Sequence, residues 1–489
     1  MIPSIILLVG DKNDSDENFI KFLELLGIEY VRVSTRDVLI QHIESGIKCI
    51  AGSSKTFNEF KEIEHEIYNK ISYVLLYETE STQSPVSASV GITNQHKDIC
   101  RELSGLSFMP AKESLFTLKE STPDIQALIS MNNKAVFAFK QKGNCRTFLL
   151  PDEVIDIKRK ISGRLTGDDC FIKIAPIAMF LRYIFPGSFT DSGNRYACLI
   201  IDDPLLKETY GFIDYYKLLE LMDVYNFFTT IAFIPWNYNR TDKKIAKLFT
   251  ERPDRFSICV HGCDHTRGEF GNRDQDYLDR KIRLSTARMI EHEERTGIPF
   301  DRVMVFPQGI FSIEAMEALD KNNYLAAVNS VPVPVNGSDY LNASDYLKCN
   351  ITSYESFPLF LRKLPDCLID FAFDLFWGKP AFMVIHNDYL RNGYEKLIDC
   401  IVKFNSLSEN IKWESVGTII DKFVINKRNP FQDISNINLS GFRINGINEN
   451  IKILIRRYAF EFRDNYLCKN DVLVDLAKKL KNLILPFHQ

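Results

Sequence analysis

The chain has 489 residues, of which 45% are hydrophobic, 12% aromatic and 25% charged, and its formal net charge at pH 7 is −4. This length exceeds one ordinary hydrophobic core, so we expect two or three domains, and the composition excludes disordered and fibrous proteins. The weakly acidic balance, without a long run of basic residues, excludes a general nucleic-acid partner, because neutralising phosphates requires a basic surface.

The amino-terminal segment has the pattern of a buried strand. Its short apolar run meets Gly10 and Asp11 directly, without the basic region and small-residue cleavage site of a secretory signal. No stretch approaches the roughly 18–20 apolar residues of a membrane span. The eleven cysteines contain no CxxC pair, and Cys198 and Cys259 lie inside apolar segments, as small buried thiols do. We therefore expect a reduced, cytoplasmic protein with no membrane span.

Residues 1–165 alternate short apolar runs with amphipathic stretches, which predicts a small, mostly parallel, doubly wound α/β domain. The expected helix is 16–26, and the expected strands are 4–9, 30–33, 47–51, 73–77 and a closing pair, 135–139 with 146–150. The closing pair resembles that of class I amidotransferase-like domains, so the fold is expected to be amidotransferase- or flavodoxin-like. No phosphate-binding glycine motif occurs, and the cysteine elbow of amidotransferases is not evident, so we assign no chemistry to this domain.

Residues 166–425 show a strict alternation of strand and helix patterns after about residue 196. The expected strands are 197–201, 229–234, 256–260, 302–306, 325–329 and 381–385, and the helices between and after them are 212–224, 243–250, 275–296, 313–322 and 393–404. So many successive βα units favour a barrel over an open sheet. The remaining residues, 426–489, alternate at 451–455 and 458–462 and end in a helix pattern at 471–483, which predicts a small appended module.

Polar residues follow three of the apolar strand patterns at the point where each ends. The segments are LIIDDP at 199–204, ICVHGCDHT at 258–266 and MVIHND at 383–388. The carboxyl ends of parallel barrel strands open on one face, so we expect these residues to converge there. Three of the eight histidines of the chain fall in these segments.

Each pair of polar residues has more than one interpretation when taken alone. His261 and His265 are four residues apart and suit one metal ion, although a surface or capped pair has the same spacing. Asp202 and Asp203 also fit a turn or a helix N-cap. Two adjacent carboxylates after a buried strand raise each other's proton affinity, however, which suits a general base beside a metal ligand.

In this order the three segments resemble the motifs of the NodB-homology polysaccharide deacetylases, carbohydrate esterase family 4. That family carries a Thr-Phe-Asp-Asp-Gly strand end, a His-Ser/Thr-x-x-His turn and a late Leu-x-His. The resemblance covers roughly half of the chain. It implies a distorted (β/α) barrel of the glycoside hydrolase and deacetylase type. By position it implies Asp203, His261 and His265 as metal ligands, Asp202 as the catalytic base and His386 as the general acid.

The implied activity is removal of an acetyl group from an N-acetylated sugar or glycan by metal-activated water. The ligand set suits zinc, with cobalt, nickel or iron as alternatives. A cytoplasmic location favours a precursor of a surface polysaccharide as the carbohydrate substrate. Trp236 and Trp377 are expected to stack on the sugar or to form the pocket wall, with ordinary packing as the alternative.

Several positions depart from the family pattern. Pro204 stands where the family has glycine, and Val305 stands where it has the arginine that orients the base aspartate. Gln308 and Arg267 are the candidates to replace that arginine, and Glu269 is an additional carboxylate that contacts substrate or caps a loop.

Two further readings stay open. One is a catalytically inactive, metal-containing relative that binds carbohydrate. The other is a glycosidase on the same barrel, which needs a second carboxylate opposite Asp202, either Glu269 or Asp388.

Overall fold

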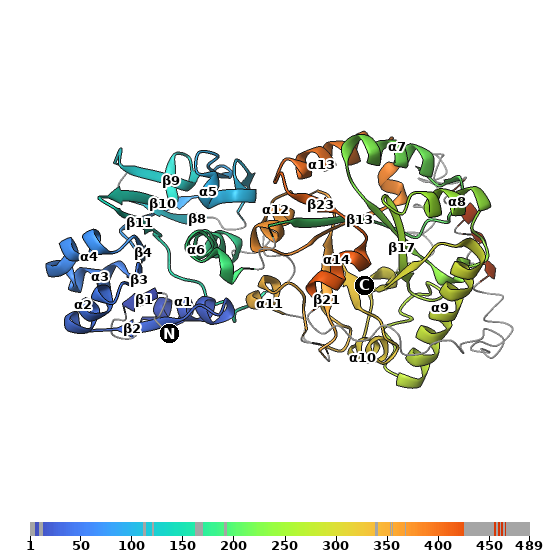
Figure 1. Ribbon diagram of the computed structural model, residues 1–489, viewed down its shortest axis with the longest axis horizontal. Helices are drawn as coiled ribbons and strands as arrows, with labels where there is room; N and C mark the ends of the chain where they lie inside the picture. Colours follow the sequence, from blue (N-terminus) through green and yellow to red (C-terminus); the bar gives the residue numbers. More distant parts are fainter. Residues whose placement is uncertain are drawn as a thin grey trace.

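A nine-stranded sheet and a closed parallel barrel make up most of the chain (Figure 1). The computed structural model describes residues 5–8, 13–110, 114–119, 122–161, 170–189, 193–337, 341–352, 354, 356–366, 368–424, 454–455, 458–459, 461–462 and 465. The domain boundaries predicted near residues 165 and 425 lie outside these residues, as does the helix predicted at 471–483.

The sheet belongs to the amino-terminal part of the chain. Five adjacent strands are parallel, in the order β2 (Tyr30–Val33), β1 (Ile5–Leu8), β3 (Cys49–Ser53), β4 (Tyr73–Tyr77) and β11 (Cys145–Leu149). Four antiparallel strands extend it, β10 (Lys134–Lys142), β9 (Ile125–Met131), β6 (Val90–Ile92) and β7 (Ser107–Phe108). The predicted closing pair is the β10–β11 hairpin, whereas the pairing of β6, β7 and β9 was not predicted.

Alternate residues of the parallel strands pack against helices on opposite faces of the sheet. Ile5 and Leu7 lie in the same apolar cluster as α1 (Asp14–Leu25), while Ile6 and Leu8 pack with α2 (Arg36–Glu44), α3 (Ser54–Glu59) and α4 (Glu64–Lys70). This two-sided burial explains why the strand sequences are apolar throughout. The prediction of a doubly wound domain is therefore confirmed.

The barrel closes through seven parallel strands. They are β13 (Arg195–Asp202), β16 (Thr229–Phe233), β17 (Phe256–His261), β18 (Phe300–Val305), β19 (Ala326–Asn329), β21 (Leu359–Lys363) and β22 (Ala381–His386), and β13 pairs with both β16 and β22. A short eighth strand, β23 (Ile411–Trp413), pairs with the start of β13. The (β/α) barrel was therefore predicted correctly, but β21 and β23 were missed.

Helices surround the barrel and close one of its ends (Figure 1). The outer helices are α7 (Tyr215–Tyr225), α8 (Lys243–Glu251), α9 (Gln275–Thr296), α10 (Ile313–Lys321), α12 (Leu368–Trp377) and α13 (Glu395–Asn405). A further helix, α14 (Val416–Phe423), packs Val416, Ile419 and Ile420 against the apolar residues inside the barrel. Asp301, near the start of β18, accepts a hydrogen bond from Gly417 N (3.1 Å), so α14 lies at the amino-terminal ends of the strands.

The two parts of the chain share an apolar contact through α6 (Cys170–Ile184), which lies between them in Figure 1. Phe180 of this helix packs edge-on against Phe148 of the sheet, and Phe171 packs edge-on against Phe373 of α12. An ion pair between Arg195 and Glu102 (2.5 Å), with each side chain only 6% exposed, adds a buried polar contact.

The described part of the tail differs from the prediction. The sequence alternates at 451–455 and 458–462, a pattern that favours strands, but the described residues 454–455, 458–459 and 461–462 are helical. Glu461 forms ion pairs with Lys207 (2.5 Å) and Arg240, which places this segment beside the loops that follow β13 and β16. None of the helices in the described ranges has the length and apolar character needed to cross a bilayer.

Candidate metal centre and active-site pocket

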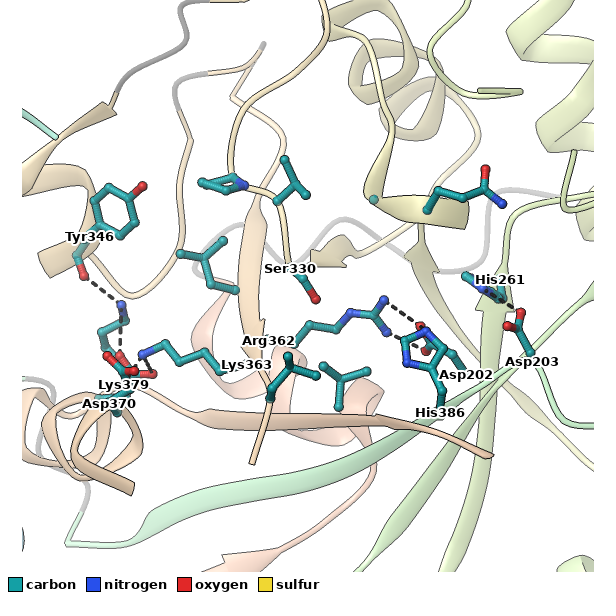
Figure 2. Close-up of a pocket in the computed structure, with 18 of the residues that line it drawn as sticks. Asp202, Asp203, His261, Ser330, Tyr346, Arg362, Lys363, Asp370, Lys379 and His386 are labelled. Atoms are coloured by element: carbon teal, nitrogen blue, oxygen red, sulfur yellow. Dashed lines mark hydrogen bonds and ion pairs between the residues drawn. The ribbon is translucent and has the colours of Figure 1, made fainter. Parts of the chain in front are cut away.

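A cavity of about 560 Å³ opens at the carboxyl ends of the barrel strands (Figure 2). On each strand, alternate residues face the barrel interior, and the inward rows are small or apolar: Cys198 and Ile200 on β13, Cys259 on β17, Phe360 on β21 and Phe382 on β22. The next inward position on each of the first three strands is polar: Asp202 on β13, His261 on β17 and Arg362 on β21. His386 is the last residue of β22. The period of two in a strand therefore turns these polar side chains into the barrel mouth.

Asp203, His261 and His265 bring one ligand atom each to a common point. Asp203 Oδ1 lies 3.2 Å from His261 Nε2 and 3.0 Å from His265 Nε2, and the three candidate ligand atoms lie within 4.8 Å of one another. Ligand bonds of about 2.0–2.2 Å around a tetrahedral zinc ion place neighbouring ligand atoms slightly more than 3 Å apart. The donor set and its spacing therefore fit a divalent metal, as predicted from the HxxxH pair and the double aspartate.

The tautomer of His261 agrees with this fit. Its Nδ1 lies 2.9 Å from the backbone oxygen of Val305, so Nδ1 carries the proton and donates it to that carbonyl. In the neutral ring, Nε2 then directs a lone pair at Asp203 Oδ1, which has no hydrogen-bond donor among the described residues. A lone pair facing a carboxylate oxygen requires a proton or a metal cation between them.

Backbone strain is concentrated around the same point. Asp203 (φ 78°), His265 (φ 54°) and Gln308 (φ 55°) adopt left-handed backbone conformations that residues other than glycine rarely take, and all three line the cavity. Such conformations cost about 1–3 kcal/mol each and persist only where the surroundings enforce them.

Glu269 enforces the conformation of the loop that carries His265. Its carboxylate accepts hydrogen bonds from the backbone N–H groups of Cys263 (2.9 Å), Asp264 (3.1 Å) and His265 (3.0 Å) and from the hydroxyl of Thr266 (3.2 Å). Gly262 leaves room for this carboxylate, because a Cβ there would lie 2.4 Å from Glu269 Oε1. Glu269 is therefore a buried loop cap and not the substrate contact that was the other expectation.

Arg362 holds Asp202 in place beside the candidate metal ligands. Its two terminal nitrogens donate to the two carboxylate oxygens at 2.6 and 2.7 Å, and the side chains of Arg362 and Asp202 are only 5% and 3% exposed. Such a two-point contact fixes both the position and the rotation of the carboxylate. His386 Nε2 lies 3.7 Å from Asp202 Oδ2 and is half exposed to the cavity.

Charge partners set the protonation of this cluster. Burial opposes ionisation of Asp202, but Arg362 and His261 outweigh it and lower the pKa of the carboxyl group below its usual value. Burial likewise opposes ionisation of Asp203, yet His265 and His261 hold its pKa well below the usual value. For His261, burial favours the neutral ring, but Asp202 and Asp203 raise its pKa overall.

Of the residues predicted to bind substrate, some line the cavity and others do not. Gln308 lines the cavity, but the hydrogen bonds to Asp202 among the described residues come from Arg362, and Arg267 is exposed and lies outside the cavity lining. Trp377 is 6% exposed and packs against Phe189 and Phe373, so its role as a sugar platform is corrected to a core residue.

Trp236 is half-buried and lies outside the lining of the cavity. Its ring faces the guanidinium of Arg288, 5.1 Å away, and its backbone N–H donates to Cys263 O (3.0 Å). Trp236 thus contacts the loop that carries His265, and its expected contact with a sugar stays a prediction.

The arginine that contacts Asp202 comes from a different strand than expected. Val305 stands at the position where the resemblance places it, and Gln308 and Arg267 were the candidates to replace it. Val305 points into the apolar barrel interior, whereas Arg362 approaches Asp202 from β21. The available signal was an arginine two residues after Phe360, at the end of a short apolar run between two prolines. That run was not recognised as a strand, so its inward row could not be assigned.

No protein-family model and no curated protein matches the chain. Solved structures that resemble part of it include a proposed polysaccharide deacetylase from Mycobacterium smegmatis, with 14% identity, a TM-score of 0.33 and coverage of 48% of this chain and 91% of that one. Family 4 carbohydrate esterase from Streptomyces lividans, in complex with acetate, has 9% identity, a TM-score of 0.29 and coverage of 46% and 93%. A family 4 acetyl xylan esterase from Clostridium thermocellum, in complex with cobalt, has 13% identity, a TM-score of 0.29 and coverage of 47% and 91%. These proteins come from the family that the sequence motifs resemble.

Proposed function

We propose that the protein is a metal-dependent hydrolase that removes an acetyl group from an N-acetylated sugar or glycan precursor. The observation that carries the proposal is the meeting of two groups in one cavity. Asp203, His261 and His265 offer three ligand atoms, and beside them Asp202 is fixed by Arg362. Three protein ligands are the number found in catalytic zinc sites, which leave a coordination position open.

A divalent metal bound to these ligands supplies a Lewis acid that polarises the acyl carbonyl and lowers the pKa of water. The side chains of Asp203, His261 and His265 would hold it, and the hydrogen bond from His261 Nδ1 to Val305 O leaves Nε2 available as a ligand.

Asp202 is the candidate general base. Its lowered pKa keeps the carboxylate ionised, and the two-point contact with Arg362 fixes its position and rotation. His386 is the candidate general acid, because it is exposed in the cavity and its Nε2 lies 3.7 Å from Asp202 Oδ2. Asp202 takes a proton from water as the water oxygen bonds to the acyl carbon, and His386 donates a proton to the amine nitrogen as the C–N bond breaks, which leaves acetate and the free amine.

The two competing readings have less support. A glycosidase needs a second free carboxylate, but the Glu269 carboxylate is already occupied by four donors of its own loop, and Asp388 lies outside the cavity lining. Arg362 argues against an inactive binding relative, because it gives Asp202, the candidate base, the cationic partner that Val305 cannot provide.

The test is acetate release from a panel of N-acetylated sugars by the zinc-loaded protein and its Asp202→Asn variant. Loss of the base is expected to lower kcat by about 10²–10⁴-fold while the metal stays bound. An Asp388→Asn variant controls for the loss of a nearby carboxylate outside the cavity. Metal bound without acetate release from any sugar in the panel contradicts the proposed activity and favours the binding relative.

The identity of the metal as zinc, the surface-polysaccharide precursor and the cytoplasmic location stay predictions from the sequence.

A further inference from the structure

The cavity has a second polar end, away from the metal ligands. Figure 2 shows Tyr346, Lys363, Asp370 and Lys379 gathered there, with Asp203 and His261 at the other end. Lys363 ends β21, Asp370 belongs to α12, Lys379 follows that helix and Tyr346 belongs to α11 (Ala343–Leu347). The cavity therefore leaves the barrel mouth and extends outward to α12. Its wall also includes apolar side chains, Val331, Leu361, Leu364, Phe373 and Val384.

Two lysines share one carboxylate at this end. Lys363 Nζ lies 2.5 Å from Asp374 Oδ2, and Lys379 Nζ lies 3.4 Å from Asp374 Oδ1. Each lysine also donates to a neutral backbone oxygen: Lys363 to that of Asp370 (3.1 Å) and Lys379 to that of Tyr346 (2.7 Å). An ammonium group has three donors and no acceptor, so each lysine can donate one more hydrogen bond.

The side chains of the two lysines are more exposed than those of the carboxyl residues that balance them. The side chains of Lys363 and Lys379 are 16% and 11% exposed, against 7% for Asp374, and Asp370 is 3% exposed as a residue. Asp370 and Asp374 line the cavity as well, so a ligand at this end meets two lysine side chains together with two less exposed carboxyl side chains.

A purely structural ion-pair cluster that fastens α12 to β21 is the competing explanation. Such a cluster needs no access to a cavity, whereas these lysines line the same cavity as the metal ligands. A cavity of several hundred Å³ with apolar walls and a few convergent polar groups is the usual form of a small-molecule site.

We propose that the substrate carries an anionic group, a carboxylate or a phosphate, which Lys363 and Lys379 bind while the acyl carbonyl lies at the metal ligands. This inference rests on the proposed function for the position of the carbonyl, but the anion site itself does not require hydrolysis. Hydrogen bonds from ammonium groups to anionic oxygens are charge-assisted. Partial burial of the two lysines strengthens such bonds, because the effective dielectric constant is lower there than in water.

The first test measures anion binding without a metal, so that anions cannot bind to it. Metal-stripped full-length protein is titrated with inorganic phosphate and with succinate by calorimetry. We expect saturable binding that Lys363→Met weakens at least about fivefold and that Lys363→Arg largely retains. Lys217→Met, which removes an exposed lysine on α7, is the matched control and is expected to bind like wild type. No saturable binding, or equal binding by Lys363→Met, overturns the anion site.

The second test locates the anion on the substrate. The zinc-loaded protein is compared on N-acetylglucosamine, on its 6-phosphate and on N-succinylglucosamine, which carry no anion, an anion on the sugar and an anion on the acyl group. We expect kcat/KM to be at least about tenfold higher for one of the two anionic compounds, and this ratio to fall in Lys363→Met. Turnover with no anion preference overturns the inference while the proposed function stands. Anion binding without turnover of any compound contradicts the proposed function and leaves the anion site in place.

Discussion

The two ends of the barrel use the same seven strands for different purposes. At the amino-terminal end, α14 fills the opening with Val416, Ile419 and Ile420. At the carboxyl end, the same inward rows continue into Asp202 and His261, and neighbouring loops hold residues in strained conformations around a cavity. Apolar packing stabilises the amino-terminal end, whereas strained backbone and buried charges at the carboxyl end lower stability. In such barrels the amino-terminal face commonly serves stability and the carboxyl face commonly carries the functional residues.

A buried and a partly buried carboxyl group show this difference. Asp202, at the mouth, faces Arg362 and keeps a lowered pKa despite its burial. Asp301, at the closed end, is surrounded by neutral donors, Gly417 N (3.1 Å) and Ser257 Oγ (3.3 Å), and burial raises its pKa to about 6. Burial alone therefore favours the acid form, and a cationic partner reverses that preference.

The largest effect on stability and activity is expected from Arg362→Leu, which removes the cationic partner of Asp202 at the barrel mouth. The variant leaves a buried carboxylate without its partner, which typically costs about 3–5 kcal/mol of the free energy of unfolding. The pKa of Asp202 should rise, and hydrolysis should be lost. Urea denaturation and acetate release measure the two effects.

Arg252→Leu is the matched control for Arg362→Leu, because Arg252 pairs with Asp223 on the surface, where side chains are 29% and 43% exposed. Removing such a pair is expected to cost at most about 1 kcal/mol. Equal destabilisation by the two changes contradicts the special role given to Arg362.

A smaller effect is expected from Glu269→Gln, which keeps the shape of the loop cap but removes its charge. The cap holds the backbone of His265, so the variant should bind the metal about 10–100-fold more weakly, as changes behind metal ligands commonly do. Competition titration with a chelator measures this affinity. An unchanged metal affinity shows that the loop does not need the cap to present His265.

The smallest effect on activity is expected from Asp301→Asn, at the closed end. The raised pKa of Asp301 means that its contribution to stability is fully present below its unfolded pKa and is lost as the pH rises through about 6. The asparagine variant should lack this loss, so between pH 4 and 7 its stability should fall less than that of wild type, by roughly 2 kcal/mol. Denaturation at several pH values measures the difference, and parallel curves contradict it.

Residues at strand ends were predictable because parallel topology brings distant segments to one face. Asp203, His261 and His265 were placed together from two short motifs, and the structure brings their candidate ligand atoms within 4.8 Å of one another. Their convergence follows from chain direction alone and needs no knowledge of side-chain packing.

Arg362 could not be placed in the same way. Its strand, β21, has five residues, two of them basic, and the sequence alone does not show which side of a short strand faces inward. Its partner Asp202 lies 160 residues earlier, and only the closure of the barrel brings the two together. The predicted role of Trp377 failed for a related reason, because the helix LIDFAFDLFW is buried on every side and gives no indication of the face that meets the cavity.

The metal content of the purified protein tests the central claim most directly. After equilibration with zinc and removal of excess metal, wild type should retain one divalent ion per chain. His261→Ala should retain none while keeping a folded circular-dichroism spectrum. His65→Ala, which removes an exposed histidine of the amino-terminal domain, should bind like wild type. Wild-type protein that retains no ion, tested also with cobalt, nickel and iron, or a His261→Ala variant that retains as much as wild type, would contradict the assignment of Asp203, His261 and His265.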